Sequence, residues 1–241
     1  MVNENDRIKI ALERLSKNFS IEKKIYDLHL GKINKVVDKK IKVNKIIFHI
    51  PYLYDENLFV LWKCLWPDCH NCCKNQARLP LTKNDITRLT AGLGYKSKID
   101  FIKNETKISS WNESELFGNV ISTITMLSLK RKKEEKEEED GNPIRCRFLD
   151  LNGNCDIQNF KPGVCSLYPF SSWIQVDNGL SQIHATFQFT GDCPGFYTSN
   201  SLDPIKDILE QYSHIIFDYN MEVNLTIREK YACINLVENH N

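Results

Sequence analysis

The sequence predicts an α+β protein, in which a cysteine-rich metal-binding domain with a small antiparallel sheet lies between an N-terminal and a C-terminal helical segment. Three observations lead to this prediction. Apolar residues recur at helical spacing near both ends of the chain. Short runs rich in β-branched residues lie between them. Eight of the nine cysteines fall between Cys64 and Cys193.

Length and composition set the limits of this prediction. The chain has 241 residues, 41% of them hydrophobic and 26% charged, which is ordinary globular usage and long enough to bury a core. The net charge of +1 argues against a role for the whole chain in binding nucleic acid or a membrane surface.

Residues 1–45 form a basic segment with 12 Lys or Arg against 6 Asp or Glu. Ile8, Ala11 and Leu15 recur at helical spacing, which predicts one or two amphipathic helices. A solvated helix face is the simplest explanation of the basic excess. Docking on a nucleic acid or on an acidic partner is the alternative.

Strands are expected within residues 46–200. Branched and aromatic residues predict strands over 45–54, 120–129 and 143–149, and a hairpin over 172–176 and 181–190 with Asn178-Gly179 in its turn. Pro51 has no N–H to donate, so the first strand is expected at a sheet edge, or with Pro51 at its end. The charged run in residues 130–142 predicts a flexible loop.

Three further helices are predicted. Thr82 is a typical N-cap with Asp85 three residues later, and this helix is expected to stop at Gly92 or Gly94. A second helix follows over about 98–107. In the C-terminal segment, residues 201–241, Asp203-Pro204 begins a helix with an apolar stripe of Ile205, Ile208, Leu209, Tyr212, Ile215 and Ile216.

The chain is expected to be cytoplasmic. Its first twenty residues lack the apolar core of a secretory signal, and no stretch of about 18 apolar residues predicts a membrane span. In a reducing compartment, clustered cysteines are more often metal ligands than disulfides.

The cysteines fall into two groups, and we predict that all eight bind metal. They are Cys64, Cys69, Cys72 and Cys73 in the first group, and Cys146, Cys155, Cys165 and Cys193 in the second. Four thiolates suit either tetrahedral zinc or an iron–sulfur cluster, and the spacing does not choose between them. Two four-cysteine centres, or one centre with spare thiols, are both compatible with the set.

Other residues near these cysteines have simpler interpretations. The flanking aromatic residues are interpreted as an apolar shell that keeps water from the thiolates; they are Trp62, Trp66, Tyr168, Phe170 and Trp173. Cys233 lies apart from both groups and is interpreted as a structural thiol. No catalytic set stands out, so whether the protein is an enzyme stays open.

Several separated pieces of the chain, over about residues 60–197, resemble the CxxCxxCC family of zinc- or iron-chelating domains. The matching pieces are Cys69-x2-Cys72-Cys73, the helix start Leu81–Ile86, Cys146–Leu149, Gly153–Ile157, Lys161–Phe170 and Cys193–Gly195. Cys64 stands two residues farther from Cys69 than the family's first gap allows, and His70 replaces a usual glycine. Lys161 replaces the usual arginine before Pro162.

This family includes bacterial flagellin lysine N-methylases. The resemblance therefore implies an iron–sulfur protein, with [4Fe–4S] favoured over zinc, that modifies lysine side chains of a protein substrate or supports such a reaction by redox chemistry. The alternative is a non-catalytic zinc module in which the metal completes the fold and the protein serves as a structural or interaction partner.

Overall fold

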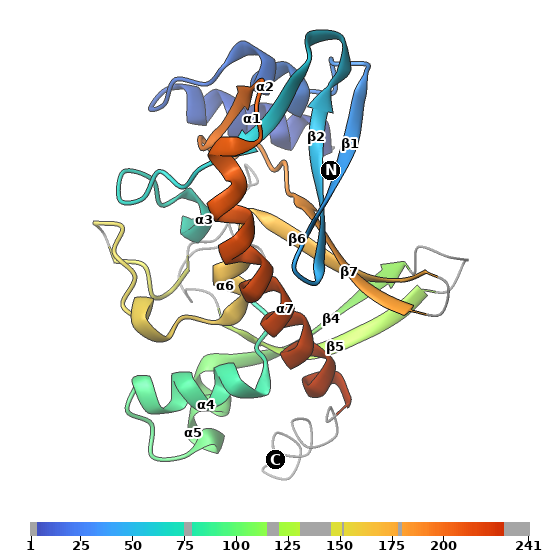
Figure 1. Cartoon of the computed structure of the whole chain (residues 1–241). Coiled ribbons are helices and arrows are strands. Elements are labelled where there is room, and N and C mark those ends of the chain that lie inside the picture. The colour runs from blue at the N-terminus through green and yellow to red at the C-terminus, as the bar shows by residue number, and fades with distance from the viewer. Residues whose placement is uncertain are drawn as a thin grey trace. The chain divides into compact units, whose positions relative to one another are not determined.

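The computed structural model describes residues 4–74, 79–114, 121–130, 146–150, 152–177 and 180–228. These ranges contain seven α-helices and two β-sheets, so the predicted α+β class is confirmed (Figure 1). The chain divides into two compact units. Unit 1 comprises Met1–Asn75, Glu137–Asn142 and Tyr168–Phe217, and unit 2 comprises Gln76–Lys136, Pro143–Leu167 and Asp218–Asn241.

Unit 1 is built on a six-stranded mixed sheet. Its strands are β1 (Val36–Val43), β2 (Ile46–Leu53), β3 (Leu58–Trp62), β6 (Phe170–Asp177), β7 (Leu180–Phe187) and β8 (Phe196–Ser199). The order is β6-β7-β2-β3-β8, and β1 also pairs with β2. All neighbours are antiparallel except β2 and β7, which are parallel.

The end of the basic segment is a strand, where the sequence predicted helix. β1 forms a hairpin with β2 in the register Val43↔Ile46, and Asn44 between them adopts a φ of 52°, a conformation that asparagine tolerates. β1 is largely exposed and includes charged residues. It nevertheless forms a strand, because it pairs with the buried strand β2 along its full length, and this pairing outweighs the local helical spacing. Lys39, Lys40 and Lys42 of this basic segment therefore lie on a strand.

The expected edge position of the strand containing Pro51 is wrong, because β2 has three partner strands. Pro51 lies opposite Asp38 of β1. Along β2 it falls between the residues that pair with β7, Ile46 to His49, and those that pair with β3, Tyr52 and Leu53. A residue without an N–H is thus accommodated in the interval between two partners.

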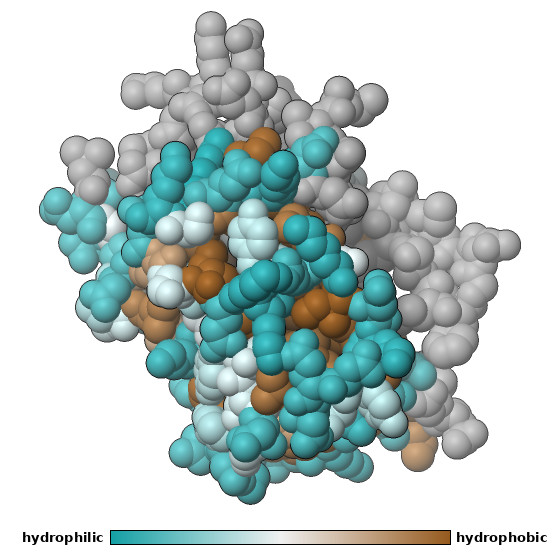
Figure 2. Space-filling model, turned by 90° about the horizontal axis from the view of Figure 1, so that it is seen from above, coloured by the Kyte–Doolittle hydropathy of each residue, from teal (hydrophilic) through white to brown (hydrophobic). Residues whose placement is uncertain are grey.

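The predicted N-terminal helices are present as α1 (Glu4–Ser16) and α2 (Lys23–His29). Leu12 and Leu15 of α1 and Ile25 of α2 are buried, while the charged residues described on α1 are exposed. Figure 2 shows a face of the molecule on which hydrophilic residues separate the hydrophobic ones. The amphipathic pattern therefore separates the buried, apolar face of these helices from their exposed, charged face.

The predicted hairpin is confirmed as β6 and β7, although its turn residues Asn178 and Gly179 lie outside the described ranges. Ile183, Ala185 and Phe187 alternate along β7 and are buried, as the period of two predicts. His184, between them, is buried on the opposite face and stacks on Trp173 with ring centroids 5.5 Å apart. Its Nδ1 is 2.9 Å from His49 Nε2. Both faces of β7 are therefore covered.

Acidification is expected to destabilise unit 1 through His29. This side chain is 7% exposed, against the rings of Phe189 and Phe196 at 5.3 and 5.9 Å. Burial lowers the pKa of His29 to about 4, although a hydrogen bond with the Phe189 backbone acts in the opposite direction. The unfolded chain protonates near pH 6.5, so stability present above that pH is lost as the pH falls towards 4, by about 3 kcal/mol.

Urea unfolding followed between pH 7 and pH 4 measures this loss. His29→Leu should flatten the pH dependence of the free energy of unfolding. His214→Gln, which changes a histidine whose side chain is 70% exposed, should leave it unchanged. An identical pH dependence in His29→Leu and the native sequence contradicts the prediction.

Unit 2 consists of helices around a two-stranded sheet. Its elements are α4 (Lys83–Gly92), α5 (Lys98–Glu105), β4 (Thr106–Ser114), β5 (Ile121–Leu129), the 3₁₀ turn Gln158–Phe160 and α6 (Gly163–Leu167). The predicted helices at 82 and 98 and the strand at 120 are confirmed over their described residues. The unit's core contains Leu79, Leu81, Ile86, Leu89, Phe101, Ile102, Leu127, Leu129, Phe148 and Ile157.

The strand predicted over 143–149 is wrong for the residues described. A turn closed by the Leu149 N–H and the Cys146 carbonyl (3.2 Å) occupies this stretch, followed by a single bridge between Leu149 and Cys155. The apolar side chains of this loop still contribute to the core, because Phe148 and Leu149 are both buried. Residues 143–145 of the predicted strand lie outside the described ranges. Residues 131–142 of the predicted charged loop lie outside them as well.

The C-terminal helix begins as predicted, with the 3₁₀ turn Asp203–Ile205 leading into α7 (Lys206–Arg228). Ile205, Leu209 and Ile216 of the apolar stripe are buried. Residues of α7 up to Phe217 belong to unit 1, and those from Asp218 onward belong to unit 2. Of the helices in the described ranges, none is both long enough and apolar enough to cross a membrane.

Candidate metal centre

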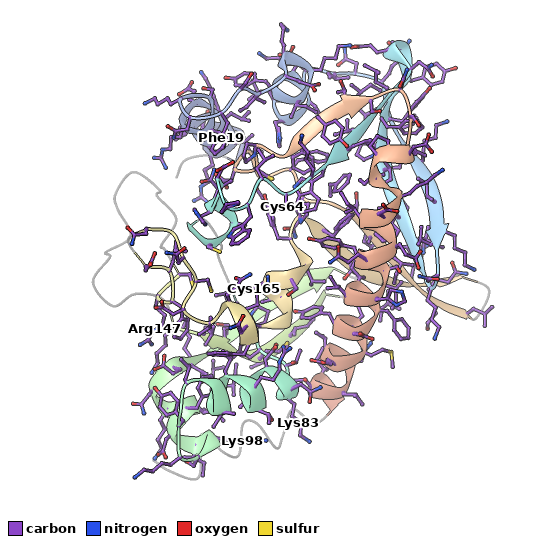
Figure 3. The ribbon with its side chains drawn as sticks, turned by 60° about the vertical axis from the view of Figure 1, so that its left-hand side comes forward. Phe19, Cys64, Lys83, Lys98, Arg147 and Cys165 are labelled. Atoms are coloured by element: carbon purple, nitrogen blue, oxygen red, sulfur yellow. The ribbon has the colours of Figure 1, made fainter. Side chains whose placement is uncertain are left out.

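The first cysteine group occupies a short loop that follows β3 in unit 1. Cys64 comes two residues after the strand, Cys69 follows a turn, and Cys72 and Cys73 lie in the one-turn helix α3 (Asn71–Lys74). Hydrogen bonds from the Cys69 N–H to the Leu65 carbonyl (3.1 Å) and from the Cys73 N–H to the His70 carbonyl (3.0 Å) fold the loop on itself. Figure 3 labels Cys64 at the start of this loop.

Cys193 joins this first group, although it is 120 residues away from Cys73 in the sequence. The antiparallel pairing of β3 with β8 places Trp62 opposite Phe196. Beyond the strands, the Lys63 N–H donates to the Gly195 carbonyl (3.0 Å), and the Asn71 Nδ2 donates to the Asp192 carbonyl (2.9 Å). The turn that carries Cys193 is thereby tied to both ends of the Cys64–Cys73 loop.

Gly195 permits this close approach. A Cβ at this position would lie 2.0 Å from the Lys63 carbonyl oxygen and 3.0 Å from Trp62 Nε1. Only a residue without a side chain lets the two backbones meet at this distance.

The sulfur of Cys193 has hydrogen-bond donors around it. Trp62 Nε1 donates to it at 3.2 Å, and it also has hydrogen bonds with the Gly195 backbone and the Tyr168 side chain. Such donors stabilise a thiolate, and they are the usual outer partners of metal-bound sulfur. Burial nevertheless raises the pKa of the Cys193 thiol, with the hydrogen bonds acting in the opposite direction.

The thiols of unit 1 interact with one another electrostatically. The pKa of Cys72 is raised first by its hydrogen bond with Cys73, and also by the charges of Cys73, Cys69 and Cys64. Cys193 is also affected by Cys69. Neighbouring thiolates repel each other in the absence of a cation, and a bound metal ion reverses that cost. The donor set thus fits a thiolate-binding metal.

Aromatic side chains from three elements pack beside these thiols. The Trp62 and Tyr212 ring centroids are 5.8 Å apart, and Phe170 lies 4.8 Å from Tyr212. The Tyr212 hydroxyl donates to the Tyr168 carbonyl (2.9 Å). Burial raises the pKa of both tyrosines, and the nearby thiols act in the same direction.

Part of the predicted aromatic shell is therefore present, and part is elsewhere. Trp62 and Tyr168 contact Cys193, and Phe170 packs against Trp62, whereas Trp66 is 65% exposed and Trp173 stacks on His184. Tyr212 was missed, because its position in an apolar helix stripe predicts a core contact and gives no sign of thiols nearby. The phenol hydroxyl within that stripe is the only signal that the sequence offers.

Cys146, Cys155 and Cys165 belong to unit 2, where each packs against the unit's hydrophobic core. Cys155 directly follows Asn154, whose N–H (2.7 Å) and Nδ2 (3.0 Å) donate to the Asp150 carboxylate. Cys165 lies in α6 and is labelled in Figure 3. Sequence grouping placed Cys193 with these three, but the structure places it with the first group.

Arg147, which follows Cys146, is more than a surface charge, because it forms an ion pair with a buried carboxylate. Arg147 Nη1 lies 2.7 Å from Glu105 Oε2, and the Glu105 side chain is only 9% exposed. The Tyr95 hydroxyl donates to the other carboxylate oxygen. This ion pair holds the segment after Cys146 against the end of α5, and sequence analysis did not identify Glu105.

Arg147→Ala is expected to lower the free energy of unfolding of unit 2 by about 3 kcal/mol, because it leaves the buried Glu105 carboxylate without its cation. Glu105→Gln in the same background should recover part of this loss, because an uncharged amide costs less to bury. Urea unfolding of the two single variants and the double variant measures the coupling. Additive effects of the two changes would contradict the role assigned to this pair.

The eight predicted cysteines are all present as thiols, five in unit 1 and three in unit 2. Within the part of the chain that the structure describes, no three His, Cys, Asp or Glu side chains already stand at the mutual positions of metal ligands. The backbone nevertheless brings Cys193 to the loop that carries the other thiols of unit 1.

An α+β fold with gathered thiols, N–H donors at sulfur and an aromatic lining defines the protein as a cysteine-cluster metal-binding protein. The model of the CxxCxxCC family, "Putative zinc- or iron-chelating domain", matches residues 63–194, and the chain belongs to this family. The match begins beside Cys64 and ends beside Cys193, so it includes all eight cysteines. Comparisons with curated proteins and with solved structures found no significant match.

Proposed function

We propose that the protein binds an iron–sulfur cluster of the [4Fe–4S] type through its cysteines. The proposed ligands are drawn from Cys64, Cys69, Cys72, Cys73, Cys146, Cys155, Cys165 and Cys193. One observation carries the proposal: strand pairing and two further hydrogen bonds bring Cys193 beside a loop that already holds four thiols.

The surroundings of these thiols support a cluster. Trp62 and the Gly195 backbone supply hydrogen bonds to sulfur, which tune the potential of iron–sulfur centres. The buried ring of Phe170 and the half-buried ring of Tyr212 pack beside Trp62, whose N–H donates to the Cys193 sulfur. When bound, such a cluster accepts and donates single electrons.

Zinc is the second candidate, because the family description names both metals and four thiolates bind zinc equally well. Zinc would give the cysteine loops a structural role, in which ligand binding supplies free energy of folding. The two candidates differ in colour, in labile sulfide and in metal content.

Anaerobic purification followed by metal and sulfide analysis tests the proposal. The expected result is a brown protein with an absorption band at about 400 nm that bleaches on reduction. One cluster corresponds to about four irons and four sulfides per chain. About eight of each would indicate two clusters. A colourless protein with stoichiometric zinc and no labile sulfide overturns the iron–sulfur proposal.

Modification of lysine side chains stays a prediction from the family resemblance. Incubation of the reduced, anaerobic protein with S-adenosylmethionine and a protein extract tests it directly. Transfer of labelled methyl groups to protein lysines supports an enzyme. No transfer by protein that is loaded with its metal contradicts the methylase prediction and leaves a redox or structural role.

A further inference from the structure

Asp85, in the first turn of α4, is a fully buried carboxylate that links two separated pieces of unit 2. Its Oδ2 accepts from the Thr82 N–H (3.0 Å), while the Asp85 N–H donates to Thr82 Oγ1 (3.1 Å). These two bonds form a capping box at the start of α4. They use only one of the two carboxylate oxygens.

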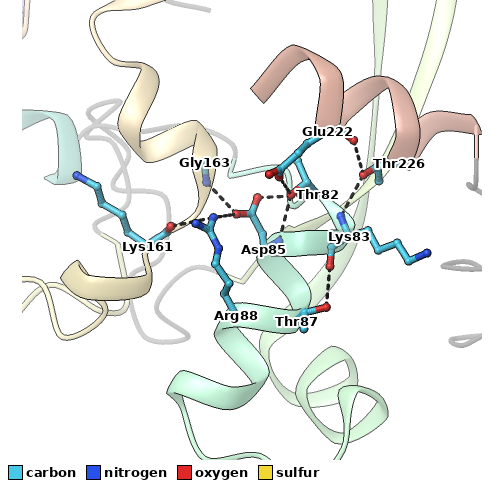
Figure 4. Close-up of polar contacts among 9 residues, drawn as sticks. All are labelled: Thr82, Lys83, Asp85, Thr87, Arg88, Lys161, Gly163, Glu222 and Thr226. Atoms are coloured by element: carbon cyan, nitrogen blue, oxygen red, sulfur yellow. Dashed lines mark hydrogen bonds and ion pairs between the residues drawn. The ribbon is translucent and has the colours of Figure 1, made fainter. Parts of the chain in front are cut away.

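The second oxygen serves another segment. Asp85 Oδ1 accepts from the Gly163 N–H at 2.9 Å, and the Arg88 guanidinium donates to the same oxygen (Figure 4). Arg88 also reaches the Lys161 carbonyl at 3.4 Å. The turn from Lys161 to Gly163 is therefore held at its carbonyl by Arg88 and at its N–H by Asp85.

This turn leads directly to Cys165. Pro162 has no N–H, so the Gly163 N–H is the next backbone donor after Lys161, and Gly163 begins α6. Position 163 has little room for a side chain, because a Cβ there would lie 2.9 Å from the Tyr219 ring. Cys165 then donates its N–H to the Pro162 carbonyl (3.0 Å). The direction of the Cys165 side chain thus depends on how Asp85 holds the turn.

A neighbouring helix shows that capping alone does not require this arrangement. α5 begins with Ser97 Oγ accepting from the Asp100 N–H (3.1 Å) and donating to Asp100 Oδ2 (2.7 Å), but Asp100 is exposed. Asp85 has the same position in its helix, is 0% exposed, and has a partner 78 residues away. Burial of a carboxylate is costly, and at this position it is offset by bonds that fix a second segment.

We infer that Asp85 is a positioning residue for the Cys165 thiol, acting through the Lys161–Gly163 turn. This inference rests on the proposed metal-binding function, in which Cys165 is a ligand. Residues that hold a ligand-bearing segment typically change metal affinity by about 10–100-fold when they are removed.

The test measures the reactivity of individual thiols in the reduced, metal-free protein. N-ethylmaleimide labelling followed by peptide mass spectrometry gives a rate for each cysteine. Asp85→Ala should change the rate at Cys165 several-fold and leave Cys155, which another turn holds, at its native rate. Asp85→Asn should lie between, because its amide oxygen still accepts from the Gly163 N–H.

Two controls separate positioning from helix capping. Thr82→Ala removes the cap of α4 but leaves the Asp85 to Gly163 bond, and Asp100→Ala removes a first-turn carboxylate from α5. Both should leave the Cys165 rate unchanged. If Asp85→Ala fails to fold, Arg88→Ala tests the same turn, because its side chain is half exposed and its loss releases the Lys161 carbonyl.

Reconstitution with iron and sulfide gives the second readout. The rate of cluster loss to EDTA should rise by about 10–100-fold in Asp85→Ala and stay native in Asp100→Ala. Equal Cys165 labelling in the native protein and Asp85→Ala overturns the inference even where metal binds. If the native protein binds no metal, the proposed function fails, while a changed Cys165 rate still establishes positioning.

Discussion

Cys193→Ser is expected to weaken metal binding by more than about 100-fold, the upper end of what loss of an outer partner costs. The serine hydroxyl is a poor ligand for zinc and iron compared with a thiolate. The change also removes the sulfur atom that Trp62 Nε1 and the Gly195 backbone contact. A metal ligand and two outer contacts of that ligand are therefore altered together. Metal per chain after anaerobic purification, and the affinity from chelator competition, measure the effect.

Two further variants give this prediction its scale. Cys233→Ser removes the one cysteine outside the predicted ligand set and should retain full metal content. Trp62→Phe keeps the ring but removes the N–H donor to sulfur, and an intermediate loss of about 10-fold is expected. Native metal content in Cys193→Ser would exclude Cys193 as a ligand and with it the principal support for the proposed centre.

Gly195→Ala is expected to lower the free energy of unfolding by about 3 kcal/mol or more and to abolish metal binding. The added methyl group would lie 2.0 Å from the Lys63 carbonyl oxygen, which is backbone and cannot turn aside. The hydrogen bond from the Lys63 N–H to the Gly195 carbonyl must then break. The Cys193 turn would separate from the loop that carries Cys64.

Gly31→Ala is the matched control for this change. Gly31 has a φ of +64°, and a Cβ there would meet nothing within 4 Å, so only the left-handed conformation is penalised, by about 1 kcal/mol. Urea unfolding and metal analysis of both variants test the comparison. A loss in Gly195→Ala no larger than that in Gly31→Ala would show that the two backbones can separate without cost.

Local patterns in the sequence predicted much of the secondary structure. Thr82 and Asp85 mark the start of α4, and the alternation from Ile183 to Phe187 marks β7, because capping and burial on one face are decided by residues close in sequence. Val36–Val43 was mistaken for helix, since its strand conformation depends on pairing with β2. Pro51 was assigned to an edge strand or to a strand end, because the number of strands beside β2 is not a local property.

The candidate site divides in the same way. Cysteine content and spacing determined by themselves that the protein carries a thiol-rich metal-binding domain, because few other chemistries need so many thiols in so short a stretch. Only the tertiary structure decided that Cys193 stands with the Cys64–Cys73 loop, that Tyr212 lines these thiols, and that Asp85 holds the turn before Cys165. Each of these depends on backbone segments from distant parts of the chain meeting through strand pairing, a close glycine contact or a buried carboxylate. Such contacts leave no periodic signal in the sequence.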